Sequence, residues 1–112
     1  MKAILDIGKT HVKLQLVDEK NHPHKSYQRK NTPLAGDYPH ADIDGIWQWL
    51  VCTLQSSPYT RSIKGFIITT HGATAALVDA SRSDNGLVMP VLDYEYQGID
   101  DWVQEAVEFY KS

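Results

Sequence analysis

Hydrophobic and polar positions near the start of the chain predict two strands joined by a tight turn. Residues 12–17 alternate between apolar and polar side chains, which is typical of a strand with one buried face. Residues 3–5 form a second apolar run, and the sequence Asp6-x-Gly8-x-Thr10 lies between the two runs. The glycine at the centre of this connection suits a sharp change of chain direction.

Two later segments carry apolar residues at helical spacing. Between residues 43 and 54 they occur at offsets 0, 3, 4, 7, 8 and 11, and the same offsets recur between residues 99 and 110. This spacing places them on one face of a helix, so an amphipathic helix is predicted in each segment. Trp47 and Trp102 fall on these apolar faces and are predicted to lie in the core, whereas Trp49 lies off the face.

Three further segments predict strands. Residues 65–70 are apolar and β-branched almost throughout, which predicts a strand covered on both faces, as in a parallel sheet. Residues 25–31 are polar and rich in lysine, which indicates an edge strand. Residues 87–92 are apolar and contain Pro90, which favours a strand near an edge. The resulting order, β-β-β-α-β-β-α, predicts an α/β fold, and residues 1–112 are expected to form a single domain that is the first part of a longer one.

Composition restricts the functions that this chain can have. The 112 residues are 42% apolar and 22% charged, which is ordinary for a globular domain. Because the net charge is −3 and the pI about 5.9, we expect neither nucleic acid nor an anionic membrane as a partner. The single cysteine, Cys52, cannot form an internal disulfide, and the first apolar run is too short for a signal peptide or a membrane span. A cytoplasmic location is therefore expected.

The turn after the first strand carries residues that suit phosphate chemistry. The Asp6 carboxylate at a strand end can hold a hydrated divalent cation. Gly8 lets a ligand approach the backbone closely, and the neighbouring N–H groups can face phosphate oxygens. The same pattern also describes an ordinary hairpin in which Gly8 serves only the turn, and the sequence leaves both interpretations open.

Three segments together resemble the FGGY family of carbohydrate kinases, which belongs to the actin, sugar kinase and Hsp70 superfamily. The first is Leu5-Asp6-Ile7-Gly8-Lys9-Thr10, and the others are residues 67–79, which contain His71-Gly72-Ala73-Thr74, and residues 87–95. They occur in the family's order and cover most of the chain. The resemblance implies an RNase H-like, actin-like ATPase fold: a mixed sheet that begins with a β-meander and carries at least two amphipathic helices on its faces.

The resemblance also implies an activity and a set of site residues. Members of this family transfer the γ-phosphoryl group of ATP to a sugar hydroxyl with the help of Mg²⁺. By position, Asp6 corresponds to the metal site. The residues that correspond to the phosphate site are Gly8, Lys9 and Thr10, and those that correspond to the sugar site are His71, Gly72, Ala73, Asp93 and Glu95.

The chain also departs from the family's pattern. Lys9 stands where many relatives have a small residue, and Thr70-His71-Gly72-Ala73 differs from the family's usual sugar-side signatures. Family members are several times longer, and the resemblance places their catalytic aspartate and adenosine pocket beyond the equivalent of residue 112. These 112 residues alone are therefore expected to lack kinase activity.

Two other classes of function remain open at this stage. Small RNase H-like resolvase nucleases also begin with an Asp-x-Gly strand and bind two metal ions through several carboxylates, although the acidic charge of this chain argues against a nucleic-acid substrate. A non-catalytic binding or assembly module is the other class. Such a module is expected to form a homodimer that covers the surface occupied by the second domain in longer relatives.

Overall fold

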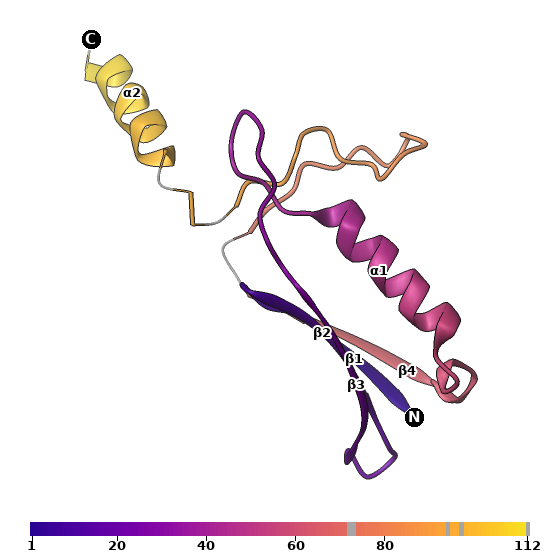
Figure 1. Cartoon of the computed structure of the whole chain (residues 1–112). Coiled ribbons are helices and arrows are strands. Elements are labelled where there is room, and N and C mark those ends of the chain that lie inside the picture. Colours follow the sequence, from indigo (N-terminus) through magenta and orange to yellow (C-terminus); the bar gives the residue numbers. More distant parts are fainter. Residues whose placement is uncertain (72–73, 94, 97, 112) are drawn as a thin grey trace.

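The fold is a four-stranded sheet with one helix on its face and a second helix beyond its end (Figure 1). The computed structural model describes residues 1–71, 74–93, 95–96 and 98–111. The elements, in chain order, are β1 (Lys2–Ile7), β2 (His11–Val17), β3 (Pro23–Lys30), α1 (Ile43–Ser56), a 3₁₀ turn η1 (Thr60–Ser62), β4 (Gly65–Thr70) and α2 (Ile99–Lys111).

The sheet has the strand order β3-β2-β1-β4. The first three strands form an antiparallel meander, and β4 returns parallel to β1 after α1, so the sheet is mixed, as predicted. The register sets Leu5 opposite both Leu14 of β2 and Ile68 of β4. Because residues that stand opposite one another share a face, these three side chains lie on the side that faces α1.

The core lies between α1 and the two middle strands. Its buried side chains are Ala3, Leu5, Val12, Leu14, Leu16, Ile46 and Leu50. Strands β1 and β2 contribute alternate residues, because the period of two sends every second side chain toward the helix. The sequence pattern of both strands and of α1 is therefore confirmed.

Helix α1 is attached to β3 at both of its ends. At its first turn, Arg29 Nη2 lies 3.1 Å from an oxygen of Asp42, which is the N-cap of the helix. At its last turn, Tyr27 Oη and Ser57 Oγ are 2.8 Å apart and share a hydrogen bond. These contacts fix both ends of α1 on the face of the sheet that carries the core.

This position of α1 makes one prediction about its tryptophans wrong. Trp47 was predicted to lie in the core, but 64% of it is exposed, whereas Trp49 is half-buried and packs against the core. The apolar stripe of α1 is broader than the surface that β1 and β2 offer, so the side nearer β4 remains uncovered. The side chain of Trp102 lies outside the described residues.

Strand β4 also differs from its prediction. It was expected to be covered on both faces, but it is an edge strand in the described part of the chain. Phe66, Ile67 and Ile68 are 42%, 53% and 61% exposed. Apolar residues on both faces predicted two covering layers, but α1 lies toward β3 and no other described element packs there.

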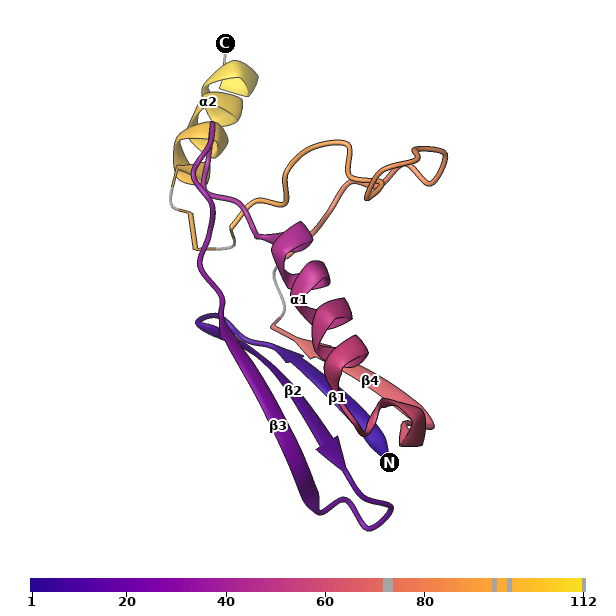
Figure 2. The ribbon, with the colours of Figure 1, turned by 45° about the vertical axis from the view of Figure 1, so that its right-hand side comes forward.

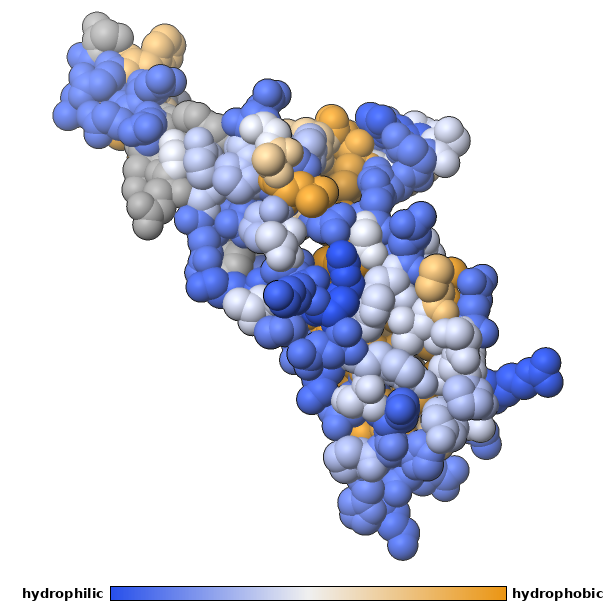
Figure 3. Space-filling view, in the orientation of Figure 1, coloured by the Kyte–Doolittle hydropathy of each residue, from blue (hydrophilic) through white to orange (hydrophobic). Residues whose placement is uncertain are grey.

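The predicted strand over residues 87–92 does not form as a regular strand. The segment makes two isolated antiparallel bridges, Val78 with Leu87 and His40 with Leu92. Pro90 has no N–H to donate, which prevents a continuous ladder. The turn before it is formed by Gly86 at φ +81°, where glycine is favoured. Apolar surface is visible among these loops above the sheet (Figure 3).

Helix α2 forms where the spacing predicted it, but it lies away from the sheet faces (Figures 1 and 2). Val103, Phe109 and Tyr110 are 57%, 76% and 88% exposed. Of the two described helices, only α1 therefore covers a face of the sheet. No helix among the described residues has the length and apolar character needed to cross a membrane.

Candidate functional site

The turn between β1 and β2 brings two backbone segments unusually close. The Gly8 N–H donates a hydrogen bond to the His11 carbonyl oxygen at 2.9 Å. A Cβ atom added at Gly8 would lie 3.0 Å from that same oxygen, which is tighter than ordinary contact. Gly8 is therefore required by the hairpin itself, and its own N–H points into the turn.

The side chain of Asn31 fastens this turn to the end of β3. Its Nδ2 group donates to the Gly8 carbonyl oxygen at 2.7 Å, and its backbone N–H donates to the Thr10 carbonyl oxygen at 2.8 Å. Lys9 and Thr10 then project from a turn whose carbonyl groups are held on both sides. Supporting hydrogen bonds of this kind hold a ligand-facing loop in one conformation. No sequence pattern singled out Asn31, because its role depends on β3 ending beside the turn.

Asp6 lies near the end of β1, on the face opposite α1. It is exposed, and the register places Lys13 of β2 and Thr69 of β4 on either side of it. No group of three potential metal ligands occurs among the described residues. One exposed carboxylate beside a threonine fits Mg²⁺ only when waters and substrate phosphates complete the coordination, which is how proteins commonly bind this ion.

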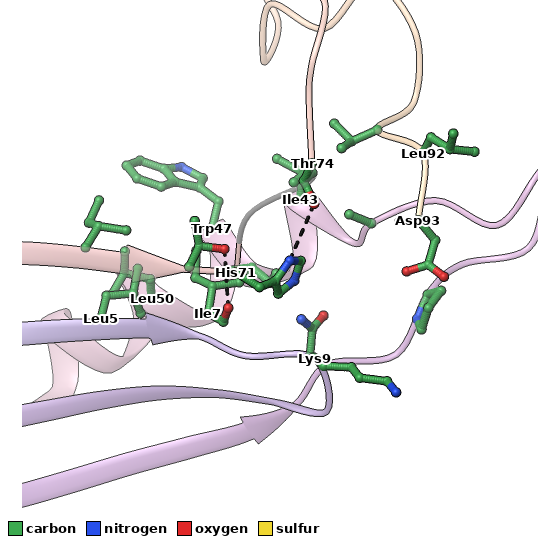
Figure 4. Close-up of a pocket in the computed structure, with 17 residues that line it drawn as sticks. Leu5, Ile7, Lys9, Ile43, Trp47, Leu50, His71, Thr74, Leu92 and Asp93 are labelled. Atoms are coloured by element: carbon green, nitrogen blue, oxygen red, sulfur yellow. Dashed lines mark hydrogen bonds between the residues drawn. The ribbon is translucent and has the colours of Figure 1, made fainter. Parts of the chain in front are cut away.

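A pocket opens on the other side of the sheet, where α1 leaves the end of β4 uncovered (Figure 4). Its volume is about 310 Å³. The walls are mainly apolar and include Leu5, Ile68 and Trp47, while Lys9, His71 and Asp93 line its polar parts. An apolar cavity with a few convergent polar groups is the usual form of a small-molecule site.

His71 and Asp93 reach this pocket from different loops. His71 directly follows β4, and its Nδ1 lies 3.5 Å from Thr74 Oγ1. Asp93 belongs to the segment that bridges back to the chain before α1, where its N–H donates to the Pro39 carbonyl oxygen at 2.9 Å. Two residues predicted from distant parts of the sequence therefore line one cavity.

Glu95 joins this group through Lys9. Lys9 Nζ and Glu95 Oε1 are 2.7 Å apart, with side chains 57% and 46% exposed. An ion pair this exposed contributes about 0–1 kcal/mol to stability, so it orients the two loops more than it holds them together. Gly72 and Ala73, which were predicted with His71, lie outside the described residues.

The predicted site residues thus occupy two sides of the sheet that meet at one turn. Lys9, His71 and Asp93 line the pocket on the α1 side, and Glu95 contacts Lys9. Asp6 lies on the opposite face, and residues 8–10 connect the two sides. Both groups lie at the carboxyl ends of the parallel strands β1 and β4, where open α/β sheets commonly bind ligands.

Comparison with solved structures identifies proteins that share this arrangement of elements. The crystal structure of a carbohydrate kinase from Novosphingobium aromaticivorans matches with a TM-score of 0.70 and 27% sequence identity. The match covers 92% of this chain and 22% of the kinase. The chain resembles carbohydrate kinases. Its mixed sheet has the actin-like ATPase fold of the N-terminal domain of sugar kinases.

Two further carbohydrate kinases, both from Lactobacillus acidophilus, show the same fold. A xylulose kinase and a gluconate kinase each match with a TM-score of 0.68 and 17% identity, and each match covers 96% of this chain. The chain spans 23% of the first and 22% of the second. No family model matches the sequence, and no curated protein matches it either. The likeness to sugar kinases is thus carried by the fold.

Proposed function

We propose that these residues form one wall of the active site of an FGGY-type, ATP-dependent carbohydrate kinase. The observation that carries this proposal is the convergence of three segments at one end of the sheet. Lys9 of the β1–β2 turn, His71 after β4 and residues 91–93 line one pocket, and Glu95 contacts Lys9, in a chain with the fold of carbohydrate kinases. The reaction proposed is transfer of the γ-phosphoryl group of ATP to a sugar hydroxyl.

The phosphate side of the proposed site is the turn formed by Gly8, Lys9 and Thr10. Lys9 supplies a cation and Thr10 a hydroxyl beside the phosphates, while the Asn31 contacts keep the turn in place. Asp6 would hold Mg²⁺ through water, and the bound metal would neutralise charge on the phosphate oxygens of ATP. Both ATP and Mg²⁺ thus belong to the proposal.

The sugar side of the proposed site comprises His71, Asp93 and Glu95, with Gly72 and Ala73 included from the sequence pattern. Asp93 and Glu95 are acceptors for sugar hydroxyl groups, and His71 is both a donor and an acceptor as a neutral imidazole. Asp93 is half-buried at the pocket, where a hydrogen bond to a hydroxyl is less exposed to competition from water. A cytoplasmic setting is proposed, since it supplies ATP.

Phosphoryl transfer depends on positioning and on electrostatics at both ends of the reacting group. In this proposal the described residues supply the phosphate-facing turn and the sugar-facing pocket, whereas the resemblance assigns the catalytic base and the adenosine pocket to positions outside these 112 residues. We therefore propose that the 112-residue polypeptide binds ligands weakly and transfers no phosphate by itself.

A nuclear magnetic resonance titration of the ¹⁵N-labelled chain tests the site. Addition of Mg²⁺-ATP is expected to shift the amide signals of residues 6–10. A panel of sugars is titrated in the same way, and any sugar that binds is expected to shift the signals near His71 and Asp93. Asp6→Asn should reduce the nucleotide response and Asp93→Asn the sugar response. Glu19→Gln, in the turn at the other end of the sheet, removes an equal charge and should change neither. Shifts scattered over the whole surface, or none, would count against the proposed site.

An assay for sugar phosphorylation tests the proposed lack of activity separately. The purified chain is incubated with Mg²⁺-ATP and the same sugars, and ADP release is followed. We expect no sugar-dependent ADP. Sustained, metal-dependent turnover that Asp6→Asn abolishes would show that these residues contain a complete site.

A further inference from the structure

Asp93 lies at the end of a long irregular connection. Residues 71–92 join it to β4, and the described part of this connection contains no helix or strand. Most of its side chains are exposed, and among the described residues after β4 only Gly86 and Val91 are buried. A connection of this length does not by itself fix the position of its end. The place of Asp93 beside the pocket therefore depends on contacts with another segment.

The contacts that hold Asp93 come from the segment just before α1. The Ala41 N–H donates a hydrogen bond to the Val91 carbonyl oxygen at 2.8 Å, and the Asp93 N–H donates to the Pro39 carbonyl oxygen at 2.9 Å. These two bonds lie on either side of Leu92, which forms an antiparallel bridge to the same segment. Because both bonds join backbone groups, this pairing sets the path of the chain that carries Asp93.

The Tyr38 side chain extends this pairing by one residue. Its hydroxyl donates a hydrogen bond to the Pro90 carbonyl oxygen at 2.7 Å, and its ring meets the His40 ring edge to face, with centroids 6.3 Å apart. Pro90 has no N–H, so its backbone offers only the carbonyl oxygen to a neighbouring segment. The Tyr38 hydroxyl satisfies this oxygen.

The segment that holds Asp93 is itself fixed to the body of the protein. Residues 34–40 form a short hairpin, closed by two backbone hydrogen bonds of 2.8 and 3.1 Å between its first and last residues. The chain then reaches Asp42, which Arg29 of β3 contacts at 3.1 Å. Asn31, just before the hairpin, holds the β1–β2 turn. The supports of Asp93 and of the proposed phosphate turn therefore belong to one short stretch of chain.

We propose that residues 38–41 position Asp93 for a hydroxyl group of the sugar, and that Tyr38 is a positioning residue of this site. Tyr38 is half-buried and is not among the residues that line the pocket. It acts by holding Pro90, and the backbone pairing carries this restraint to Asp93. A carboxylate that is already held in place loses less freedom when a ligand binds, and this raises affinity. The inference rests on the proposed function, because it concerns the sugar side of that site.

Amide hydrogen exchange tests this support without any ligand. The Asp93 N–H is expected to be protected by its bond to Pro39, and Tyr38→Phe, which removes only the hydroxyl, is expected to speed its exchange about fivefold. The amide of Leu14, in the core, should keep its rate. Tyr59→Phe is the matched control, because it removes the same group beyond the last turn of α1 and should change neither rate. An Asp93 rate that Tyr38→Phe leaves unaffected would overturn the proposal.

Ligand titration separates positioning from a general loss of stability. The chain is titrated with aldoses, ketoses and polyols, and separately with Mg²⁺-ATP. For each sugar that binds the unaltered chain, Tyr38→Phe is expected to weaken binding about fivefold, while the response of residues 8–10 to Mg²⁺-ATP and the melting temperature stay the same. Equal sugar affinities, or a parallel loss of the sugar and nucleotide responses, would overturn the inference. If no sugar binds the unaltered chain, the proposed function is wrong, and the role of Tyr38 in it is wrong too.

A reversible covalent link can replace the missing hydrogen bond. His40 and Leu92 are opposed without bonding to each other's backbone, and the Cα atoms of such pairs are about 4.5 Å apart, within the range a disulfide spans. His40→Cys and Leu92→Cys are introduced together into Tyr38→Phe, with Cys52→Ser as background. The oxidised protein is expected to bind sugar about fivefold more tightly than the same protein after reduction. An affinity that does not depend on the oxidation state would contradict the positioning role.

Discussion

Arg29 of β3 holds the N-cap residue of α1, Asp42, through a contact of 3.1 Å between Nη2 and Oδ2. The other carboxylate oxygen of Asp42 accepts a hydrogen bond from the Gly45 N–H at 3.0 Å. One half-buried carboxylate thus satisfies a free N–H of the first helical turn and fixes the helix to the sheet. The Arg29 Nη1 group is buried and makes no hydrogen bond with the described residues.

Asp42→Ala should therefore cost more than the loss of a helix cap. We expect the free energy of unfolding to fall by about 2 kcal/mol, of which about half comes from the cap and the rest from a hydrogen bond between charged groups. Asp42→Asn retains a capping oxygen and should lose about half as much. Urea denaturation measures both. No loss of stability in Asp42→Asn would show that the contact with Arg29 adds nothing, and equal losses in the two variants would show that the cap adds nothing.

The two tryptophans of α1 should respond differently to truncation. Trp49→Ala removes a side chain that packs on the core and is expected to destabilise the protein by about 2 kcal/mol or more. Trp47 is 64% exposed, so Trp47→Ala should change stability by only about 0.5 kcal/mol. Chemical denaturation gives both values. The reverse order would contradict the orientation of α1.

Gly8→Ala should weaken the β1–β2 hairpin. The new methyl group would meet the His11 carbonyl oxygen at 3.0 Å, and that oxygen cannot retreat without lengthening its hydrogen bond from Gly8 N–H. A loss of about 1–2 kcal/mol is expected. In the control, Gly65→Ala, the added carbon would lie 3.8 Å from Lys2 Cγ, an ordinary contact. Thermal unfolding should separate the variants, and equal melting temperatures would refute the steric argument.

The ion pair between Lys9 and Glu95 should compete with phosphate if the turn is the phosphate site. Glu95→Gln removes an acidic neighbour of Lys9, so the affinity for Mg²⁺-tripolyphosphate should rise, while Lys9→Met should lower it. Stability should change by less than about 1 kcal/mol in both variants because the pair is exposed. Isothermal titration calorimetry measures the affinities. Weaker binding by Glu95→Gln would place the phosphate away from Lys9.

Asp18 should make the β2–β3 turn sensitive to acid. Hydrogen bonds from the backbone N–H of His22, then of Lys20, and the nearby histidine rings hold the pKa of the Asp18 carboxyl below its ordinary value of 3.8. A carboxyl whose pKa is lowered on folding stabilises the fold above pH 3.8 and loses this effect as the pH falls through the lowered pKa. The melting-temperature difference between the unaltered chain and Asp18→Asn should therefore shrink below pH 3.8. A constant difference would show that Asp18 has the same pKa in both states.

The sequence was a good guide to elements whose pattern is local. The spacing of apolar residues identified α1 and α2, and the lysines identified β3 as an edge. It was a poor guide to which surfaces meet. Trp47 shares the helical stripe with Leu50, but the attachments to β3 leave Trp47 outside the core.

In the candidate site, too, the sequence predicted local motifs better than contacts between distant segments. A short motif pointed to residues 6–10, and a family resemblance pointed to His71 and Asp93, which line one pocket with Lys9. Asn31 was missed because its bonds to the turn arise only when β3 ends beside it. Asp6 was assigned to the metal site next to the phosphate residues, and because side chains alternate along β1 it lies on the face of the sheet opposite the pocket.

The parallel pairing of β1 with β4 also bears on the order in which the chain can fold. Strands β1, β2 and β3 are neighbours in sequence, so their pairing closes only short loops. The contact of Lys2 with Gly65 must instead close a loop that includes all of α1, and such distant contacts form late and slowly. As the chain leaves the ribosome, the meander can assemble first, with one side of β1 unpaired until β4 arrives. Variants in β4 should accordingly alter the unfolding rate more than the folding rate.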